Sequence, residues 1–150
     1  MKILQKNKKA YFDYDIKETY EAGIKLTGSE VKSIKEGGAN LTGSYVQITS
    51  KGIPIVVGMH IAKYSKDSSK EEYDPTKSRQ LLLHKKEINK ILGKLTQKRY
   101  VAVPILLKSV RNMIKLEIGI GKSKRNIDKR ETVKKREAKR DIERTLKNNF

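Results

Sequence analysis

Short runs in which apolar and polar residues alternate recur along the chain and predict β-strands. In residues 113–121, every second residue from Ile114 to Ile120 is Ile or Leu, and most of the residues between them are polar. This alternation places one face of a strand against a core and the other toward water. By pattern and by composition we expect further strands at residues 10–16, 20–26, 44–50, 53–61 and 100–110. A turn signal at residues 50–52 predicts that two of these strands form a hairpin.

Two other segments have apolar residues three or four positions apart, which predicts helices. Residues 29–35 carry Val31 and Ile34 on one side, and two glycines follow. Residues 84–97 carry four Ile or Leu residues on one stripe and lysines outside it. The polar, turn-rich residues 64–79 predict an exposed loop before the second helix. This order favours a mainly β fold with helices, best matched by an OB-like closed barrel of about six to eight strands with flanking helices.

The end of the chain differs in kind from the rest. Residues 122–150 contain twelve Lys or Arg against five acids, without proline or glycine. The apolar residues from Ala138 to Phe150 recur every fourth position, which gives only a thin helical stripe. Such a stripe buries too little to offset an ordering cost of about 1–2 kcal/mol per residue. We therefore predict a body at residues 1–121 and a basic tail at 122–150 that is disordered alone and helical against a polyanion. A solubilising tail that binds nothing is the alternative.

Composition and charge narrow the class of partner. The net charge of +18 over 150 residues favours a polyanion, because neutralising phosphates releases their counterions. The absence of cysteine excludes disulfides and thiolate metal sites. No run approaches about 18 consecutive apolar residues, and the N-terminus lacks the apolar stretch of a signal peptide. We expect a cytoplasmic protein that does not bind a membrane.

Candidate catalytic chemistry is sparse. His60 and His84 are far apart in sequence and have no ligand set around them, so we expect neither a metal nor another cofactor. The run Gly-Lys-Ser at residues 121–123 follows a predicted strand, as in a phosphate-binding loop. That motif requires a glycine where Leu116 stands, and no amphipathic helix follows directly. We therefore expect no enzymatic activity.

Basic clusters lie at the edges of the predicted elements, where a barrel could gather them into one nucleic-acid-binding surface. We take as candidates Lys8 and Lys9 beside Asn7, Lys32 and Lys35 on the first helix, and Lys122 and Lys124 at the start of the tail. Lys85 and Lys86 at the start of the second helix belong to the same pattern. A solvated surface would explain any one of these residues by itself.

Four separated blocks resemble the SmpB family, the SsrA-binding proteins, in the order in which the family has them. They are Asn7-Lys8-Lys9-Ala10; Tyr20-Glu21-Ala22-Gly23 with residues 28–33; Asp74-Pro75 with residues 81–84 and Glu87; and Asp128-Lys129-Arg130. The resemblance runs essentially from end to end. A general RNA-binding or ribosome-assembly protein would share the barrel and the basic tail but not these blocks.

The resemblance implies a non-enzymatic RNA-binding protein with an OB-like barrel. The barrel would hold the tRNA-like domain of transfer-messenger RNA. Protein and RNA together would mimic a tRNA, enter a stalled ribosome with elongation factor Tu, and let translation resume on the reading frame of the RNA. The tail would form a helix in the vacant mRNA channel near the decoding centre, and the protein would act as a monomer.

The resemblance also assigns candidate RNA-binding residues. These are Asn7, Glu21, Leu82, His84 and Lys115. Glu21 could accept hydrogen bonds from a base edge or could instead brace a neighbouring lysine. Leu82 could belong to the core, whereas an exposed Leu82 would suit contact with an unstacked base. His84 stands where some members of the family have asparagine.

For the tail, the resemblance places Asp128, Lys129 and Arg130 near the decoding centre and gives Leu146 an apolar role in accommodation. We add the basic residues Lys134, Arg136 and Arg140 as candidate ribosome contacts. The sequence departs from the family at Ser123-Lys124, where a glycine and a basic residue are usual, which predicts a stiffer hinge at the start of the tail.

Overall fold

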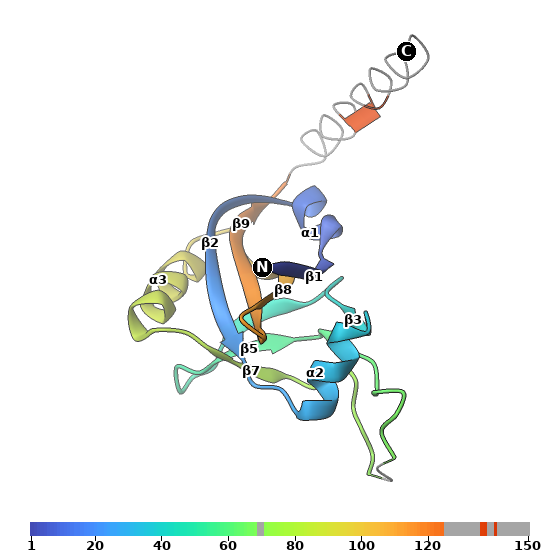
Figure 1. Cartoon of the computed structure of the whole chain (residues 1–150). Helices are drawn as coiled ribbons and strands as arrows, with labels where there is room; N and C mark the ends of the chain where they lie inside the picture. Colours follow the sequence, from blue (N-terminus) through green and yellow to red (C-terminus); the bar gives the residue numbers. More distant parts are fainter. Residues whose placement is uncertain (69–70, 125–135, 138–139, 141–150) are drawn as a thin grey trace.

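The computed structural model of the chain describes residues 1–68, 71–124, 136–137 and 140 (Figure 1). These residues form a seven-stranded sheet, a two-stranded sheet and three helices. The strands are β1 (Lys2–Lys6), β2 (Tyr14–Ile24), β3 (Ala39–Asn40), β4 (Tyr45–Ile48), β5 (Pro54–Val57), β6 (His60–Ile61), β7 (Arg79–Leu82), β8 (Tyr100–Val110) and β9 (Met113–Ser123). The helices are α1 (Lys8–Asp13), α2 (Gly28–Lys35) and α3 (Lys85–Leu95).

A long hairpin of β8 and β9 lies within the larger sheet. At its tip, Arg111 and Asn112 have φ angles of 51° and 64°. Two consecutive residues with positive φ match the turn that best fits the twist of paired strands. Strand β2 pairs with the other edge of β9, so three long antiparallel strands lie side by side. The apolar residues at alternate positions from Ile114 to Ile120 are all buried, which confirms the pattern read from the sequence.

The larger sheet curls but is not closed by hydrogen bonds. Its order is β1-β8-β9-β2-β7-β5-β4, with every pair antiparallel. No ladder joins the two edge strands β1 and β4 within the part of the chain that the structure describes. The curl brings β4 into contact with β8. The mainly β fold with helices is confirmed, and the closed OB-like barrel stays a prediction.

The strand predicted at residues 10–16 is wrong for its first half, where the structure has helix α1. The chain from Lys8 to Asp13 is helical instead, because Asn7 caps it. The side-chain oxygen of Asn7 accepts a hydrogen bond from the backbone N–H of Ala10 at 3.2 Å. This bond satisfies a donor that has no partner within the helix. The side chains of Tyr11 and Phe12 favour a strand, but the local cap outweighs that preference.

Further differences concern strands. Strands β1 and β3 were not predicted, and the strand predicted at residues 53–61 is two strands, β5 and β6. The predicted strands at 10–16 and 20–26 are replaced by one strand, Tyr14–Ile24, that runs through the charged link between them. Strand β7 was not predicted, because its four residues follow a polar loop and begin with a charged side chain. That side chain, Arg79, is buried and neutralised within the protein. The hairpin of β4 and β5 around residues 50–52 is confirmed.

Both predicted helices are confirmed, with slightly different ends. Thr27 caps α2: its hydroxyl accepts from the N–H of Glu30, whose carboxylate accepts from the N–H of Thr27. This reciprocal pair fixes where the helix begins. In α3 the apolar stripe faces the sheet through Ile91, which is fully buried. The core lies between the curled sheet and these helices.

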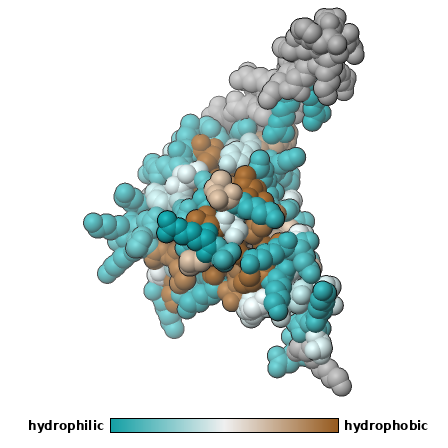
Figure 2. Space-filling model, in the orientation of Figure 1, coloured by the Kyte–Doolittle hydropathy of each residue, from teal (hydrophilic) through white to brown (hydrophobic). Residues whose placement is uncertain are grey.

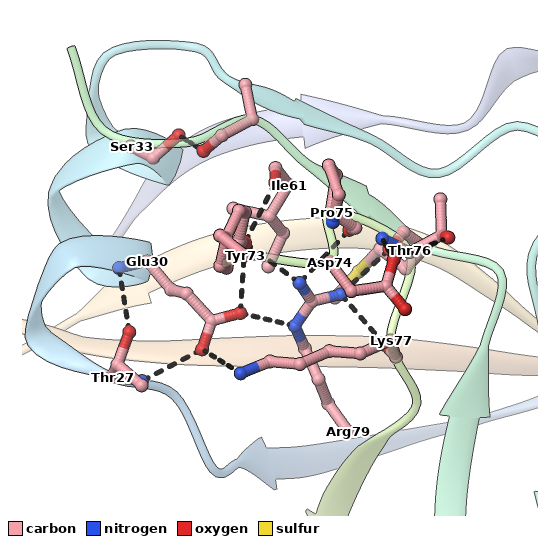
Figure 3. Close-up of polar contacts among 12 residues, drawn as sticks. Thr27, Glu30, Ser33, Ile61, Tyr73, Asp74, Pro75, Thr76, Lys77 and Arg79 are labelled. Atoms are coloured by element: carbon pink, nitrogen blue, oxygen red, sulfur yellow. Dashed lines mark hydrogen bonds and ion pairs between the residues drawn. The ribbon is translucent and has the colours of Figure 1, made fainter. Parts of the chain in front are cut away.

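A buried ion pair ties α2 to strand β7 (Figure 3). The Nε of Arg79 lies 2.5 Å from the carboxylate of Glu30, and the two side chains are 1% and 2% exposed. The guanidinium also donates to the carbonyls of Met59, Pro75 and Lys77 and to the hydroxyl of Tyr73. Its remaining donors therefore all have acceptors, which is what a buried charge requires. The pair fixes the position of α2 relative to β7, and both elements border the site described next.

Candidate RNA-binding groove and basic surfaces

A groove of about 590 Å³ lies where α2, β2, β7, the start of α3 and the tip of the β8–β9 hairpin meet. Its volume falls in the range of about 300–1,000 Å³ that is usual for binding pockets. The residues that line it are Glu21, Gly23, Ile24, Leu26, Val31, Leu82, Leu83, His84, Glu87, Asn112, Met113, Ile114 and Lys115. Four of the residues that the resemblance assigns to RNA binding are among them.

Strand pairing brings these four residues together from distant parts of the sequence. Gly23 on β2 lies opposite Leu82 of β7 on one side and opposite Lys115 of β9 on the other. Glu21 lies two residues before Gly23 on the same strand, and His84 follows two residues after Leu82. A side chain at position 23 would crowd Leu82, because a Cβ added there would lie 3.2 Å from the Leu82 Cβ. The glycine therefore leaves room for Leu82 at the groove.

Leu82 is a surface residue and not part of the core. Its exposed fraction is 50%, which decides between the two alternatives that the sequence left open. Met113, also exposed, lines the same groove at the tip of the hairpin. Sequence reasoning did not select Met113, although its position at the polar face of a strand next to a turn was a signal. The groove thus offers apolar surface beside the charge of Lys115.

Glu21 is braced by a lysine that the sequence did not single out. Its carboxylate lies 2.7 Å from the Nζ of Lys108 on β8, and Glu117 lies 3.9 Å from the same nitrogen. Glu21 and Glu117 are direct partners across β2 and β9, so Lys108 neutralises two neighbouring like charges. The hydrogen bond from Lys108 is the main reason why the pKa of Glu21 is lowered. Of the two roles considered for Glu21, the structure supports the bracing of a lysine.

His84 occupies the position before the first turn of α3. Its backbone N–H donates to the carboxylate of Glu87 at 3.1 Å, and its side chain is exposed beside the groove. The backbone bond is part of a helix cap and needs no particular side chain at position 84. The exposed imidazole lies at the N-cap of α3, on the lining of the groove.

Asn7, by contrast, directs its amide into the protein. It is 4% exposed, and its side-chain nitrogen donates to the carbonyls of Pro104 at 2.8 Å and Leu41 at 3.2 Å. These bonds join the start of α1 to β8 and to the segment before β4. An effect of Asn7 on RNA binding would therefore act through the fold.

The basic candidates are divided between separate surfaces outside the groove. Lys32 and Lys35 are exposed on α2, with the Lys32 Nζ 5.5 Å from the centre of the Tyr64 ring. Lys8 and Lys9 on α1 lie near Lys122 at the end of β9 and Lys124 just after it. Lys124 Nζ donates to the Tyr11 carbonyl at 2.9 Å, so α1 and the end of β9 adjoin. Lys85 and Lys86 are exposed separately, at the start of α3. The clusters do not meet at one point.

The candidate tail residues fall mostly beyond what the structure describes. Asp128, Lys129, Arg130, Lys134 and Leu146 lie outside the described residues, whereas Arg136 and Arg140 are described and exposed. Strand β9 continues to Ser123, two residues past the predicted end of the body.

Two further observations bear on what this part of the chain can do. None of the described helices has the length and apolar character needed to cross a membrane. Within the described residues, no three His, Cys, Asp or Glu side chains are grouped so that they could hold a metal ion.

Similarity to known proteins extends over nearly the whole chain. Residues 4–148 match the family model "SmpB protein". The chain is 43% identical to the SsrA-binding protein of Oceanobacillus iheyensis, over 99% of this chain and 96% of the relative. It is 47% identical to the SsrA-binding protein of Coprothermobacter proteolyticus, over 96% of each. For the SsrA-binding protein of Bacillus subtilis the identity is 43%, over 97% of this chain and 92% of the relative.

A solved structure described as "tmRNA-SmpB: a journey to the center of the bacterial ribosome" contains a chain with a similar fold. The TM-score is 0.68 and the identity 39%, over 86% of this chain and 93% of that one. The family model and these relatives show that the chain belongs to the SmpB family.

Proposed function

We propose that this protein binds the tRNA-like domain of transfer-messenger RNA through the groove and delivers the RNA to stalled ribosomes for trans-translation. One observation carries the assignment of the site: Glu21, Leu82 and Lys115 come from three strands, His84 comes from the N-cap of α3, and all four line one groove. The relatives are SsrA-binding proteins, and the similar solved chain belongs to a complex of SmpB with that RNA. The protein acts by binding and not by catalysis.

The chemistry of the groove suits an RNA loop with unstacked bases. Leu82 and Met113 provide apolar surface for a base face, and Lys115 provides a positive charge for a phosphate. Lys108 neutralises the carboxylate of Glu21, so this carboxylate does not repel the phosphate backbone of the RNA. A hydrogen bond from a base to the second oxygen of Glu21 fits this arrangement as well.

The tail, residues 122–150, has a separate task in this proposal. In this proposal the tail is disordered in the free protein and becomes helical in the mRNA channel of the small subunit. An intact message would occupy the same channel and exclude the tail. Its ribosome contacts are Asp128, Lys129, Arg130, Lys134, Arg136, Arg140 and Leu146. The protein enters the ribosome as a monomer in the cytoplasm, and elongation factor Tu joins through the RNA.

The body, residues 1–121, is proposed to work as an OB-like barrel. The contact between β4 and β8 and the bonds from Asn7 to Leu41 and Pro104 hold the edges of the curled sheet together, where the described residues form no ladder. A body fixed in this way presents the groove on a rigid surface, which limits the entropy lost on binding.

The experiment that tests this function compares variants of the full chain. Leu82→Ala and Lys115→Gln should each weaken binding to the isolated tRNA-like domain, while Lys51→Gln, an exposed lysine in the β4–β5 turn, should not. Competition with a folded RNA of equal length measures specificity. Equal binding of the two RNAs would favour a general RNA-binding or ribosome-assembly protein and would remove the proposed function.

A further inference from the structure

A second hollow lies on the body between β1, α1 and β8, next to two residues of the tail. Its volume is about 610 Å³, and it shares no lining residue with the groove. The residues that line it are Ile3, Lys6, Lys8, Tyr11, Ile105, Leu106, Arg136 and Arg140. Figure 2 has the same orientation as Figure 1, in which β1 and α1 are visible. Seen from this side, the surface has hydrophobic areas between hydrophilic side chains.

The charges around this hollow are all of one sign. Lys6, Lys8, Arg136 and Arg140 line it, and no acid does so among the described residues. None of the four forms an ion pair with an acid in the part of the chain that the structure describes. The groove, in contrast, contains two glutamates and one lysine. Four like charges around one concave surface attract an anion strongly, because the surface focuses their field.

Body and tail meet at this hollow through α1. The backbone N–H of Lys124 donates to the carbonyl of Asp13 at 2.9 Å, and its Nζ donates to the carbonyl of Tyr11 at 2.9 Å. The Arg136 guanidinium lies 5.8 Å from the centre of the Phe12 ring, within reach of a cation–π contact. Arg136 and Arg140 are four residues apart, a spacing that places two side chains on one face of a helix.

Tyr11 adds an aromatic surface between these cations. Its exposed fraction is 47%, so part of the ring is open to a ligand. The pKa of Tyr11 is raised, mainly because the rest of the side chain is buried and to a lesser degree because Glu117 is negatively charged. The hydroxyl therefore stays protonated and can donate to a phosphate oxygen. Glu117 itself lies 3.9 Å from Lys108, which offsets its charge.

We propose that this hollow binds the phosphate backbone of a single-stranded RNA segment, with a base stacked on Tyr11 and with body and tail holding the same strand. Cations that follow a backbone beside an aromatic platform are the usual means of binding single strands. The proposal rests on the proposed function only in taking RNA as the polyanion. It deepens that function, because RNA bound here would fix the tail against α1 as the protein enters the ribosome.

The chain contains no tryptophan, so Tyr11→Trp creates a single fluorescent reporter in the hollow. The full-length reporter protein is titrated with oligouridylate at several salt concentrations. Binding should quench the tryptophan, and Lys6→Gln or Arg140→Gln should each reduce the slope of log K against log salt by about 0.7. The matched control Lys51→Gln should leave the slope unchanged. Quenching that is absent, or that responds equally to all three changes, would overturn the proposal.

A double-variant cycle tests whether body and tail share the strand. If they do, Lys6→Gln and Arg140→Gln together should reduce log K by less than the sum of their separate effects. Full additivity would overturn the shared strand. Equal quenching by polyglutamate or by vesicles of anionic lipid would overturn the choice of RNA. Binding of the tRNA-like domain is measured on the wild-type protein and on Lys6→Gln and should be the same for both. Failure of the wild-type protein to bind that domain would count against the proposed function alone.

Discussion

Replacing Arg79 by methionine should destabilise the body more than any single change at its surface. The substitution keeps an unbranched side chain of similar length but removes the charge and all five hydrogen bonds of the guanidinium. The carboxylate of Glu30 would remain 2% exposed, with Lys77 at 3.8 Å as its nearest cation. Breaking a buried ion pair in this way costs about 3–5 kcal/mol.

The assay is thermal and urea unfolding of the full chain, followed by far-ultraviolet circular dichroism. A loss of about 3–5 kcal/mol is a large share of the roughly 5–15 kcal/mol that stabilises an ordinary domain. At about 2–8 °C per kcal/mol, the Tm should fall by at least about 6 °C. The double variant Glu30→Met with Arg79→Met should recover part of the loss, because it leaves no buried charge unpaired.

Lys77→Gln is the matched control. Lys77 also approaches Glu30, but its side chain is well exposed, so its removal should cost less than about 1 kcal/mol. If Arg79→Met unfolded at the same temperature as Lys77→Gln, the buried pair would not stabilise α2 against β7, and the reasoning would be refuted.

The same pair predicts a dependence on pH. Burial acts to raise the pKa of Glu30, but bonds from Thr27 and Arg79 and the charges of Arg79 and Lys77 outweigh it and lower the pKa below the ordinary value of 4.5. Ionised Glu30 therefore contributes its full stability above pH 4.5 and loses it as the pH falls through the lowered value. The difference in unfolding free energy between wild type and Arg79→Met should narrow in acid.

Four other outcomes can be checked. Asn7→Ala should cost about 1–3 kcal/mol in urea unfolding, because two buried carbonyls lose their donor; an unchanged midpoint would mean that water replaces the amide. Leu82→Ala should weaken binding to the tRNA-like domain in a gel-shift assay, and a loss of about 2–5 kcal/mol in stability would mark it as core instead. A chain ending at Lys124 should bind that domain nearly as well as the full chain at moderate salt, and abolished binding would contradict the separation of body and tail. Alanine at residues 128–130 should preserve RNA binding but prevent peptide tagging on stalled ribosomes, and normal tagging would remove the role of the tail.

Strand β9 and the β4–β5 hairpin could be predicted because their patterns are local. The alternation from Ile114 to Ile120 and the turn at residues 50–52 each indicate one structure by themselves. Helix α1 could not be predicted from pattern, since its residues favour a strand and the decisive bond comes from one capping side chain, Asn7. Strand β7 was missed because its first residue is charged, and only the folded chain brings Glu30 to Arg79.

The candidate site was predictable by resemblance more than by composition. Charge drew attention to lysines on α1 and α2, whereas the groove contains a single lysine, Lys115. The partner of Glu21 is Lys108, which lies 87 positions away in the chain and is placed there by the pairing of β2, β9 and β8. No spacing rule in the sequence connects the two, so this contact required the sheet register.

The buried pair also restricts how this sequence can change over time. A substitution at Glu30 alone, or at Arg79 alone, would leave an opposite charge without a partner in the core. Either first step would therefore be selected against, even where the doubly substituted protein folds well. The two positions should covary: among natural members of the family, sequences that lack the carboxylate at position 30 should also lack the guanidinium at position 79.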